Sequence, residues 1–471
     1  MKTKFLGIAI WLLILGTSGL CLALNAQDRT LYFMDIHPQK NMVNPAFQND
    51  ASVLIVGLSA SSFFDNSSLT FSDLLTRKTV DGVSEVYWDF ESIDKKLRDK
   101  NFLYVGGSVS PIFVGLKLND KWYLNFSASL KNDSYLMYPG SISKLRFGNA
   151  NLETNSPRTI DLNNYNFKEQ SYTEFSFGAS KKVNDKFTYG AHIKALMGLS
   201  SIKTNHFLAS IETSDDFSES ILKTDISMNT SGTLFEADKL KRVFNTQIQV
   251  DDFLYGKEAF GFKNFGVALD VGITYSLSDK MDIYASMVDL GFIKWGKSAQ
   301  QLISNDEFKF SGAYFSPYIV NEDDFDFVDY LKQYADTLSS TVIPDSYSKD
   351  YRTNLVPKTY LGASYRYSDK LSFNGLFNSH IYKNGYVAKG TLGATWMPIK
   401  RIGLTGTVSY SNFSLYNFGF GFQYKAKSMQ VYLVTDNINS LDVWNSRGLN
   451  LAFGVHFQVW KGEATASMVG Y

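Results

Sequence analysis

The feature that most limits what this chain can fold into is a hydrophobicity period of two. Four stretches show it most clearly: 122–131, 267–277, 416–425 and 449–459. Because successive side chains of a strand point to opposite faces, each stretch is predicted to be a strand with one apolar and one polar face. In the second stretch we expect Val267, Leu269, Val271 and Ile273 to face lipid, and Asp270, Gly272 and Thr274 to face a lumen.

The length of these stretches indicates what the apolar face meets. Each runs for about 9–11 residues, the length that a tilted strand needs to cross a bilayer. The composition agrees, because aromatic residues make up 15% of the chain and only 9 of its 471 residues are proline, a balance that suits β-structure. The sequence therefore predicts an all-β fold, a transmembrane antiparallel up-and-down β-barrel.

Charge and hydrophobicity exclude two other classes. Lys plus Arg total 46 and Asp plus Glu total 46, so there is no basic surplus for a nucleic acid partner. Hydrophobic residues reach only 44%, which is too low for a bundle of transmembrane helices.

A recurrent short turn separates neighbouring alternating segments. It occurs as Asn119-Asp120-Lys121, Asn184-Asp185-Lys186, Ser278-Asp279-Lys280 and Ser368-Asp369-Lys370. Side chains of these types bond to their own backbone in tight turns. Short turns at one end and variable loops at the other are the pattern of outer-membrane barrels.

These turns permit a strand count. Six pairs are expected, at 112–118/122–131, 173–182/187–199, 265–277/281–294, 358–367/371–381, 386–397/402–411 and 415–425/429–436. Adding 51–60 at the start and 448–459 at the end predicts about 14 strands. A further pair near 205–212 and 223–234 would make 16.

The N-terminus is predicted to be an export signal, residues 1–26. Lys2 and Lys4 precede an apolar run that ends in small, neutral residues before Gln27, the layout of a cleavable signal peptide. A retained membrane anchor is the alternative, because the uncharged run is long enough to span a bilayer. The single cysteine, Cys21, follows Leu20, which argues against lipidation.

The barrel is assigned to residues 51–471, and residues 27–50 form a separate segment. Pro38 and Pro45 make this segment unsuitable for barrel wall, since proline cannot donate to a strand ladder. Its apolar side chains need shelter from water, and the lumen is the nearest shelter. We expect it to enter the lumen as a plug that turns toward the first strand at the candidate residues Asn44, Pro45, Ala46 and Phe47. A periplasmic tail that pairs with a partner is the alternative.

These residues carry a resemblance to known families. The Asn44-Pro45-Ala46 segment before the first strand is similar to FadL-like transporters and to the PorV and SprF/PorP proteins of type IX secretion. The stretch from Ala268 to Trp295, with Val288-Asp289-Leu290-Gly291-Phe292 inside it, resembles an outer-membrane barrel family of Bacteroidota defined as a domain of unknown function. The resemblance implies a 14-stranded barrel with an N-terminal plug.

Chemistry-bearing motifs do not occur in the sequence. It contains no Gly-x-Ser-x-Gly, phosphate-binding or His-Glu-x-x-His motif. The five histidines are scattered, and His192 and His456 fall on polar strand faces, where lumen positions are expected. Ser379 and His380 are adjacent on a strand and point to opposite faces, so they cannot act as nucleophile and base. We therefore expect no enzyme activity, no catalytic residue, no metal site and no cofactor.

Two further segments have helical spacing. Phe90, Ile93 and Leu97 precede the first long hairpin, and Phe327, Leu331, Tyr334 and Leu338 lie in an acidic insertion. Both are expected to be short amphipathic helices in loops or in the barrel mouth.

Two function classes follow, both in the outer membrane of a Gram-negative cell with membrane lipid as one partner. The first is FadL-like passage of small hydrophobic molecules. The second is a structural barrel that docks secretion or surface proteins. An apolar, plugged lumen favours the first class, and an apolar patch exposed on the loops favours the second.

Overall fold

The structure is a computed structural model that describes residues 29–34, 37–80, 83–147, 150–151, 156–216, 218–232, 264–296, 298–310, 318–321, 345–382, 385–411, 416–442 and 444–460. The expected signal peptide, 1–26, and the expected helix at Phe327 to Leu338 lie outside these residues.

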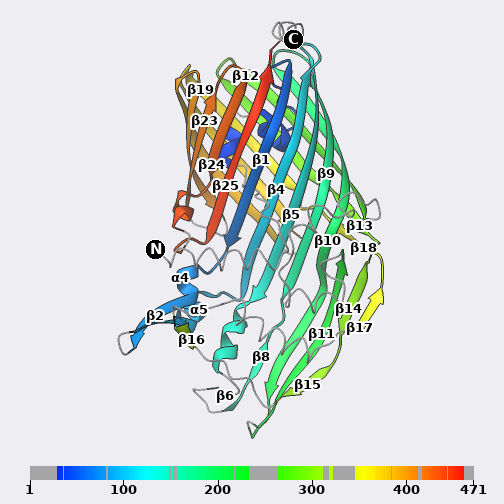
Figure 1. Ribbon diagram of the computed structural model, residues 1–471, viewed down its shortest axis with the longest axis vertical. Helices are drawn as coiled ribbons and strands as arrows, with labels where there is room; N and C mark the ends of the chain where they lie inside the picture. The colour runs from blue at the N-terminus through cyan, green and yellow to red at the C-terminus, as the bar shows by residue number, and fades with distance from the viewer. Residues whose placement is uncertain are drawn as a thin grey trace.

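Fourteen of the described strands pair in one closed antiparallel ring (Figure 1). Around the ring they are β1 (Val53–Asn66), β4 (Lys100–Lys117), β5 (Trp122–Pro139), β9 (Asn166–Lys182), β10 (Phe187–Thr213), β12 (Phe265–Ser278), β13 (Met281–Trp295), β19 (Lys358–Ser368), β20 (Leu371–Tyr382), β21 (Gly385–Ile399), β22 (Ile402–Ser411), β23 (Asn417–Lys425), β24 (Met429–Thr435) and β25 (Gly448–Val459). The first and last strands close it, since Val53 of β1 is in register with both Leu116 of β4 and Val459 of β25. The chain is therefore an all-β, fourteen-stranded β-barrel, as predicted.

The alternative of sixteen ring strands is wrong. Residues 205–212 and 223–231 do pair, as the second half of β10 and as β11 (Ser220–Ser231). Within the ring, however, β12 occupies the place beside β10, from Phe187↔Tyr275 to Met197↔Phe265. The extra pair therefore continues the sheet beyond the barrel and does not widen it.

The predicted faces are confirmed in β12. Val267, Leu269, Val271 and Ile273 have 40–43% of their surface exposed, whereas Asp270 is fully buried. Because every second residue points outward, the exposed apolar side chains form the outer surface of the ring and the polar ones line its interior.

The recurrent turns lie at the end of the barrel that is drawn uppermost in Figure 1. The side-chain oxygen of Asn119 accepts hydrogen bonds from the backbone N–H groups of Lys121 and Trp122, both at 2.9 Å. Asn184 does the same for Lys186 and Phe187. These bonds explain why Asn-Asp-Lys forms such a compact turn.

Several strands are longer than predicted. β4 begins at Lys100 instead of 112, and β10 runs for 27 residues. The sequence does not reveal the first half of β4, because Gly106, Gly107 and Pro111 interrupt the alternating pattern. In the structure a shift of register between Val109 and Ile112 accommodates Pro111, because a residue in a bulge does not have to donate the ladder hydrogen bond that proline, lacking an N–H, cannot make.

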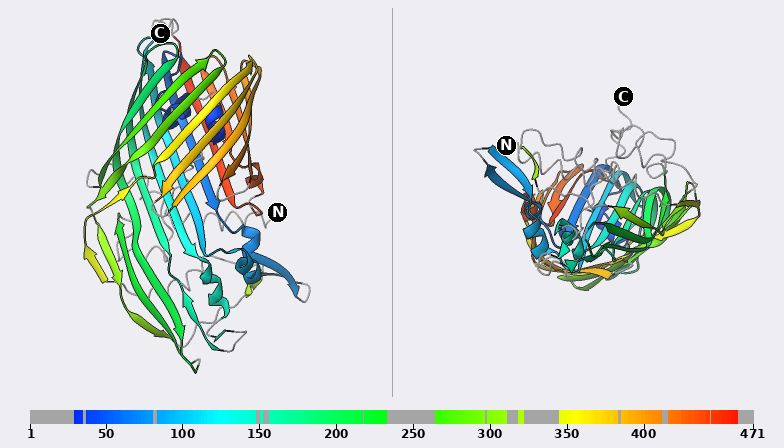
Figure 2. Two further views of the ribbon diagram at one scale, coloured as in Figure 1. Left: turned by 180° about the vertical axis from the view of Figure 1, so that it is seen from behind. Right: turned by 90° about the horizontal axis from the view of Figure 1, so that it is seen from below.

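The long-loop end carries further small elements (Figures 1 and 2). Beyond the ring, β8 (Thr159–Asp161), β11, β14 (Gln300–Ser304), β15 (Glu307–Phe310), β17 (Asp345–Ser348) and β18 (Tyr351–Asn354) extend the main sheet. Two small sheets are also present. One comprises β2 (Leu75–Val80), β3 (Val83–Trp88) and β16 (Tyr318–Asn321), and the other comprises β6 (Ala150–Asn151) and β7 (Ser156–Pro157). The short helices here are α4 (Phe71–Leu74), α5 (Phe90–Lys96), η1 (Gly140–Phe147) and η3 (Ile438–Leu441).

Helix α5 matches the helix expected from Phe90, Ile93 and Leu97. Asp89 caps it by accepting a 3.0 Å hydrogen bond from the backbone N–H of Ser92, and Ile93 is its buried residue. In the described part of the chain, no helix has both the length and the apolar character needed to span a membrane.

The N-terminal segment contains two further helices, α2 (Arg29–Phe33) and α3 (His37–Val43). Both are dark blue in Figure 1 and lie among the barrel strands. Helix α2 contacts β20, β21, β22, β23 and β24, and α3 contacts β13. Every residue of α2 is buried, so the segment lies inside the ring.

Candidate functional site

The lumen segment, residues 29–50, is anchored at its beginning by Asp436. The carboxylate of Asp436 accepts hydrogen bonds from the backbone N–H groups of Arg29, at 3.2 Å, and Thr30, at 2.7 Å. It also pairs with Nε of Arg29 at 3.2 Å, and both side chains are almost completely buried. A carboxylate at these free N–H groups is favourable because it neutralises the positive end of α2.

The turn toward the first strand is held by Asn44. Its side-chain oxygen accepts a 3.0 Å hydrogen bond from the N–H of Ala46, while its amide donates to the carbonyl of Ile273 in β12 at 3.2 Å. The wall approaches closely here, since a Cβ atom at Gly272 would lie 2.0 Å from Oδ1 of Asn44, and one at Gly190 would lie 2.3 Å from the carbonyl oxygen of Pro45. Glycine at these two positions makes room for the turn.

The other predicted plug residues also face the interior. Ala46 is 2% exposed, and the ring of Phe47 lies 5.1 Å from that of Tyr284 on β13 and 5.7 Å from that of Tyr32. Tyr32 stacks in turn on Tyr360 of β19, with ring centroids 5.7 Å apart. Aromatic contacts therefore join the lumen segment to the neighbouring strands β13 and β19.

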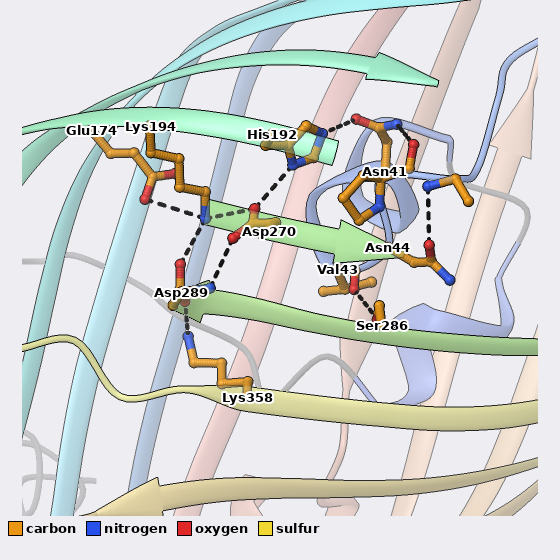
Figure 3. A network of polar contacts seen from close by, with 12 residues as sticks. Asn41, Val43, Asn44, Glu174, His192, Lys194, Asp270, Ser286, Asp289 and Lys358 are labelled. Atoms are coloured by element: carbon orange, nitrogen blue, oxygen red, sulfur yellow. Dashed lines mark hydrogen bonds and ion pairs between the residues drawn. The ribbon is translucent and has the colours of Figure 1, made fainter. Parts of the chain in front are cut away.

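A band of buried charged side chains runs from strand to strand along the wall, beside the lumen segment (Figure 3). Lys194 of β10 lies at its centre, with Nζ 2.8 Å from Asp270 of β12 and 2.6 Å from Asp289 of β13. Lys358 of β19 approaches Asp289 to 3.1 Å, and Glu174 of β9 lies 3.6 Å from Lys194. Lys131 of β5 extends the band by a 2.8 Å pair with Glu174. Each buried charge is thus compensated by a neighbour, as burial requires.

A β-bulge brings Asp289 into this band. On β13, Val288 and Asp289 together oppose Asp270, because Leu290 pairs with Leu269 and Met287 with Val271. Asp289 has φ 61°, a left-handed conformation that Asp adopts more readily than most residues. Its N–H donates to Asp270 at 2.8 Å. The Val288-Asp289 pair of the resemblance motif is therefore the bulge.

One histidine connects the charge band to the lumen segment. His192 of β10 contacts Asp270 through Nδ1 at 2.9 Å and the side-chain oxygen of Asn41 in α3 through Nε2 at 3.1 Å. Both His192 and Asn41 are buried. A second link is made by Ser286 of β13, whose hydroxyl donates to the carbonyl of Val43 at 2.6 Å. Figure 3 shows both links.

Aromatic side chains meet across the lumen nearer the long-loop end and form what we call the aromatic constriction. Tyr104 of β4 and Tyr382 of β20 come from strands on opposite sides of the ring, yet their ring centroids are 4.7 Å apart. Tyr135 of β5 contacts Tyr382 at 5.4 Å. Phe63, Phe102 and Val387 pack against the same group. The two walls therefore touch across the barrel through apolar rings.

A buried ion pair spans the lumen beside this constriction. Lys389 of β21 lies 3.1 Å from Asp65 of β1, and these strands are not neighbours in the ring. The lumen is thus obstructed twice, by the lumen segment toward the turn end and by the aromatic constriction toward the loop end.

Sequence reasoning found part of this site. The candidate residues Asn44, Pro45, Ala46 and Phe47 lie inside the ring, where His192 and His456 are also buried, and their role as a plug stays a prediction. It missed the charge band, for which there was a signal: charges of opposite sign stand at inward positions of consecutive strands. It also missed the aromatic constriction. Among the described residues, no group of His, Cys, Asp and Glu side chains could hold a metal ion.

Fold and site together define a β-barrel whose lumen is occupied by its own N-terminal segment. The chain belongs to the family of unknown function DUF5723, which it matches over residues 45–436. No curated protein matches it.

Solved structures with a similar outline include two toluene transporters and a FadL homologue. The toluene transporter TodX of P. putida is 12% identical, with 88% of this chain and 91% of that chain covered and a TM-score of 0.40. The toluene transporter TbuX of Ralstonia pickettii is 11% identical, with 93% and 98% covered and a TM-score of 0.42. A Pseudomonas aeruginosa FadL homologue is 10% identical, with 93% and 97% covered and a TM-score of 0.43. The fold described here rests on the strand pairing of the chain itself.

Proposed function

We propose that this chain is an outer-membrane channel for small hydrophobic molecules, and that residues 27–50 plug its lumen. The observation that carries the proposal is the double obstruction of a closed ring by the lumen segment and the aromatic constriction. We infer a passage that is closed at rest and opens when these contacts separate.

The aromatic constriction supports a hydrophobic substrate. Tyr104, Tyr135 and Tyr382 present ring surfaces to one another, and an apolar molecule could replace those contacts as they part. A hydrated ion would lose its water there without compensation. The apolar outer face of the ring supports a position in the bilayer, where exposed Leu and Val side chains are favourable.

Uptake of a labelled monoaromatic hydrocarbon by Gram-negative cells tests this proposal. Cells that make the full-length protein should take up the compound faster than cells without it. Tyr382→Lys should slow uptake by placing a charge in the constriction. The matched control is Tyr386→Lys, because Tyr386 is 62% exposed on the neighbouring strand. Equal uptake with and without the protein would contradict a hydrophobic channel.

A second candidate function is docking of a surface partner. It is favoured by the part of β10 that continues past Met197, its last residue paired with β12, to Thr213. This extension presents Leu208 with half of its surface exposed. A photocrosslinking residue at position 208 should capture a partner in cells if docking is the function. An absence of adducts there would leave the channel as the better account.

A further inference from the structure

A cavity between the start of the lumen segment and the wall has the features of a ligand site. It has a volume of about 300 Å³ and lies at the long-loop end of the barrel, between the start of α2 and residues of β1, β23 and β25. Its lining includes Arg29, Arg447, Asn437, Asn450, Ser446 and Tyr416. This volume lies at the lower end of the usual range for small-molecule sites, so it suits a ligand of about the size of one sugar ring.

Two buried donors that belong to lining residues have no acceptor. They are Nη1 of Arg29 and Nδ2 of Asn450, on side chains that are 3% and 5% exposed. Leaving buried donors unpaired is unfavourable. Because both unpaired groups are donors, the missing partner has to be an acceptor.

Asp436 bonds to both of these residues and so holds them close together. Its carboxylate pairs with Nε of Arg29 at 3.2 Å, and its backbone N–H donates to the side-chain oxygen of Asn450 at 3.1 Å. That carboxylate is already shared among Arg29 and the first two N–H groups of α2. The second carboxylate nearby, Asp65, is paired with Lys389.

The remaining lining favours an anion that carries hydroxyl groups. Arg447 is exposed and adds a second positive charge. The exposed side chain of Asn439 can both donate to and accept from hydroxyl groups, whereas Asn437 and Ser446 bond to each other and to the carbonyl of Gly448 and so hold the cavity wall in place. Tyr416 also lines the cavity, and its ring packs on that of Tyr410 with the centroids 5.9 Å apart.

We propose that this cavity binds a small hydroxylated carboxylate, such as a sugar acid, whose carboxylate accepts hydrogen bonds from Arg29 and Asn450. A guanidinium and an amide that donate to one carboxylate give strong, directional recognition. This site goes beyond the proposed channel function and can be tested apart from it, because a binding assay does not depend on conduction.

Isothermal titration of the purified full-length protein in detergent tests the site. The probes are glucuronate, glucose and glucosamine, which share a ring and differ in charge. Glucuronate should bind about tenfold or more tightly than either other sugar, because only it supplies the acceptor. Equal affinity for glucuronate and glucose, or no binding of glucuronate, would overturn the proposal.

Two variants locate the binding. Asn450→Asp replaces the unpaired donor by an acceptor and should weaken glucuronate binding by about tenfold or more. Arg447→Gln changes an exposed side chain, so it keeps the fold and should weaken glucuronate binding severalfold. It therefore tests the site even if Asn450→Asp fails to fold. The matched control is Arg401→Gln, an exposed arginine in a turn at the other end of the barrel, which should bind as the parent does. Equal loss in Arg401→Gln and Arg447→Gln would place the binding elsewhere and contradict the site.

Discussion

At the scale of single residues, the buried charge band is the feature most sensitive to substitution. Lys194 lies within 3.6 Å of three carboxylates, those of Asp270, Asp289 and Glu174. Removing one partner of a buried ion cluster leaves the others uncompensated, which costs far more than the cluster contributes as a whole.

Lys194→Met should therefore lower the free energy of unfolding by about 3–5 kcal/mol. The measurement is urea unfolding of the protein refolded in lipid vesicles. The control is Lys309→Met, which breaks an exposed pair with Glu219 and should change stability by about 1 kcal/mol or less. Similar losses for both variants would show that the band is not buried as described.

The outward face of β12 gives a second residue-scale test. Leu269→Arg should cost about 2–4 kcal/mol of folding free energy, because it places a charge on the lipid-facing surface. Thr274→Arg points to the interior near a barrel end and should cost much less. The same unfolding assay compares them, and equal defects would indicate a soluble fold with two buried faces.

At the scale of elements, the lumen segment depends on Asn44. Asn44→Ala removes its bonds to the carbonyl of Ile273 and to the N–H of Ala46, at a cost of about 1–3 kcal/mol. Hydrogen exchange in residues 29–47 should therefore become about tenfold faster or more. The control is Gln48→Ala, which removes only the 3.2 Å hydrogen bonds to the carbonyl of Lys121 and the hydroxyl of Ser180. It should change the exchange rate of residues 29–47 little. Unchanged exchange in Asn44→Ala would contradict a segment anchored by this turn.

The elements also show how far the sequence predicts the fold. All fourteen ring strands were predicted from alternation and turns, because both patterns are local properties of the chain. The first half of β4 was missed, since glycines and Pro111 hide it. The lumen position predicted for Asn44 to Phe47 rests on proline and apolar content. These properties do not indicate that Asn44 bonds to Ile273 or that Val43 bonds to Ser286, because both wall residues come from strands distant in sequence.

The site was less predictable than the fold for the same reason. The contact between Tyr104 and Tyr382 depends on which strands face each other across a closed ring, and no local pattern records that. The bulge at Asp289 depends on two residues opposing one across two strands. Charges at inward positions could have suggested the band, though not which side chains pair.

At the scale of the whole molecule, we expect an outer-membrane protein with a tightly closed barrel. Membrane fractionation should recover it with the outer membrane, and the unheated protein should migrate faster in electrophoresis than the boiled one, because a closed ring of strands resists detergent. Recovery in the soluble periplasmic fraction would contradict this location.

The central claim is that two separate obstructions close the lumen, and conductance of single molecules in planar bilayers tests it most directly. The full-length protein, a variant lacking residues 27–47, Tyr382→Ala and the two changes combined are compared, each first shown to form a heat-modifiable barrel. We predict that the full-length protein stays closed to ions, that each single change gives at most brief openings, and that the combined variant conducts steadily. A combined variant as silent as the full-length protein, or a full-length protein that conducts as well as the combined variant, would contradict the account.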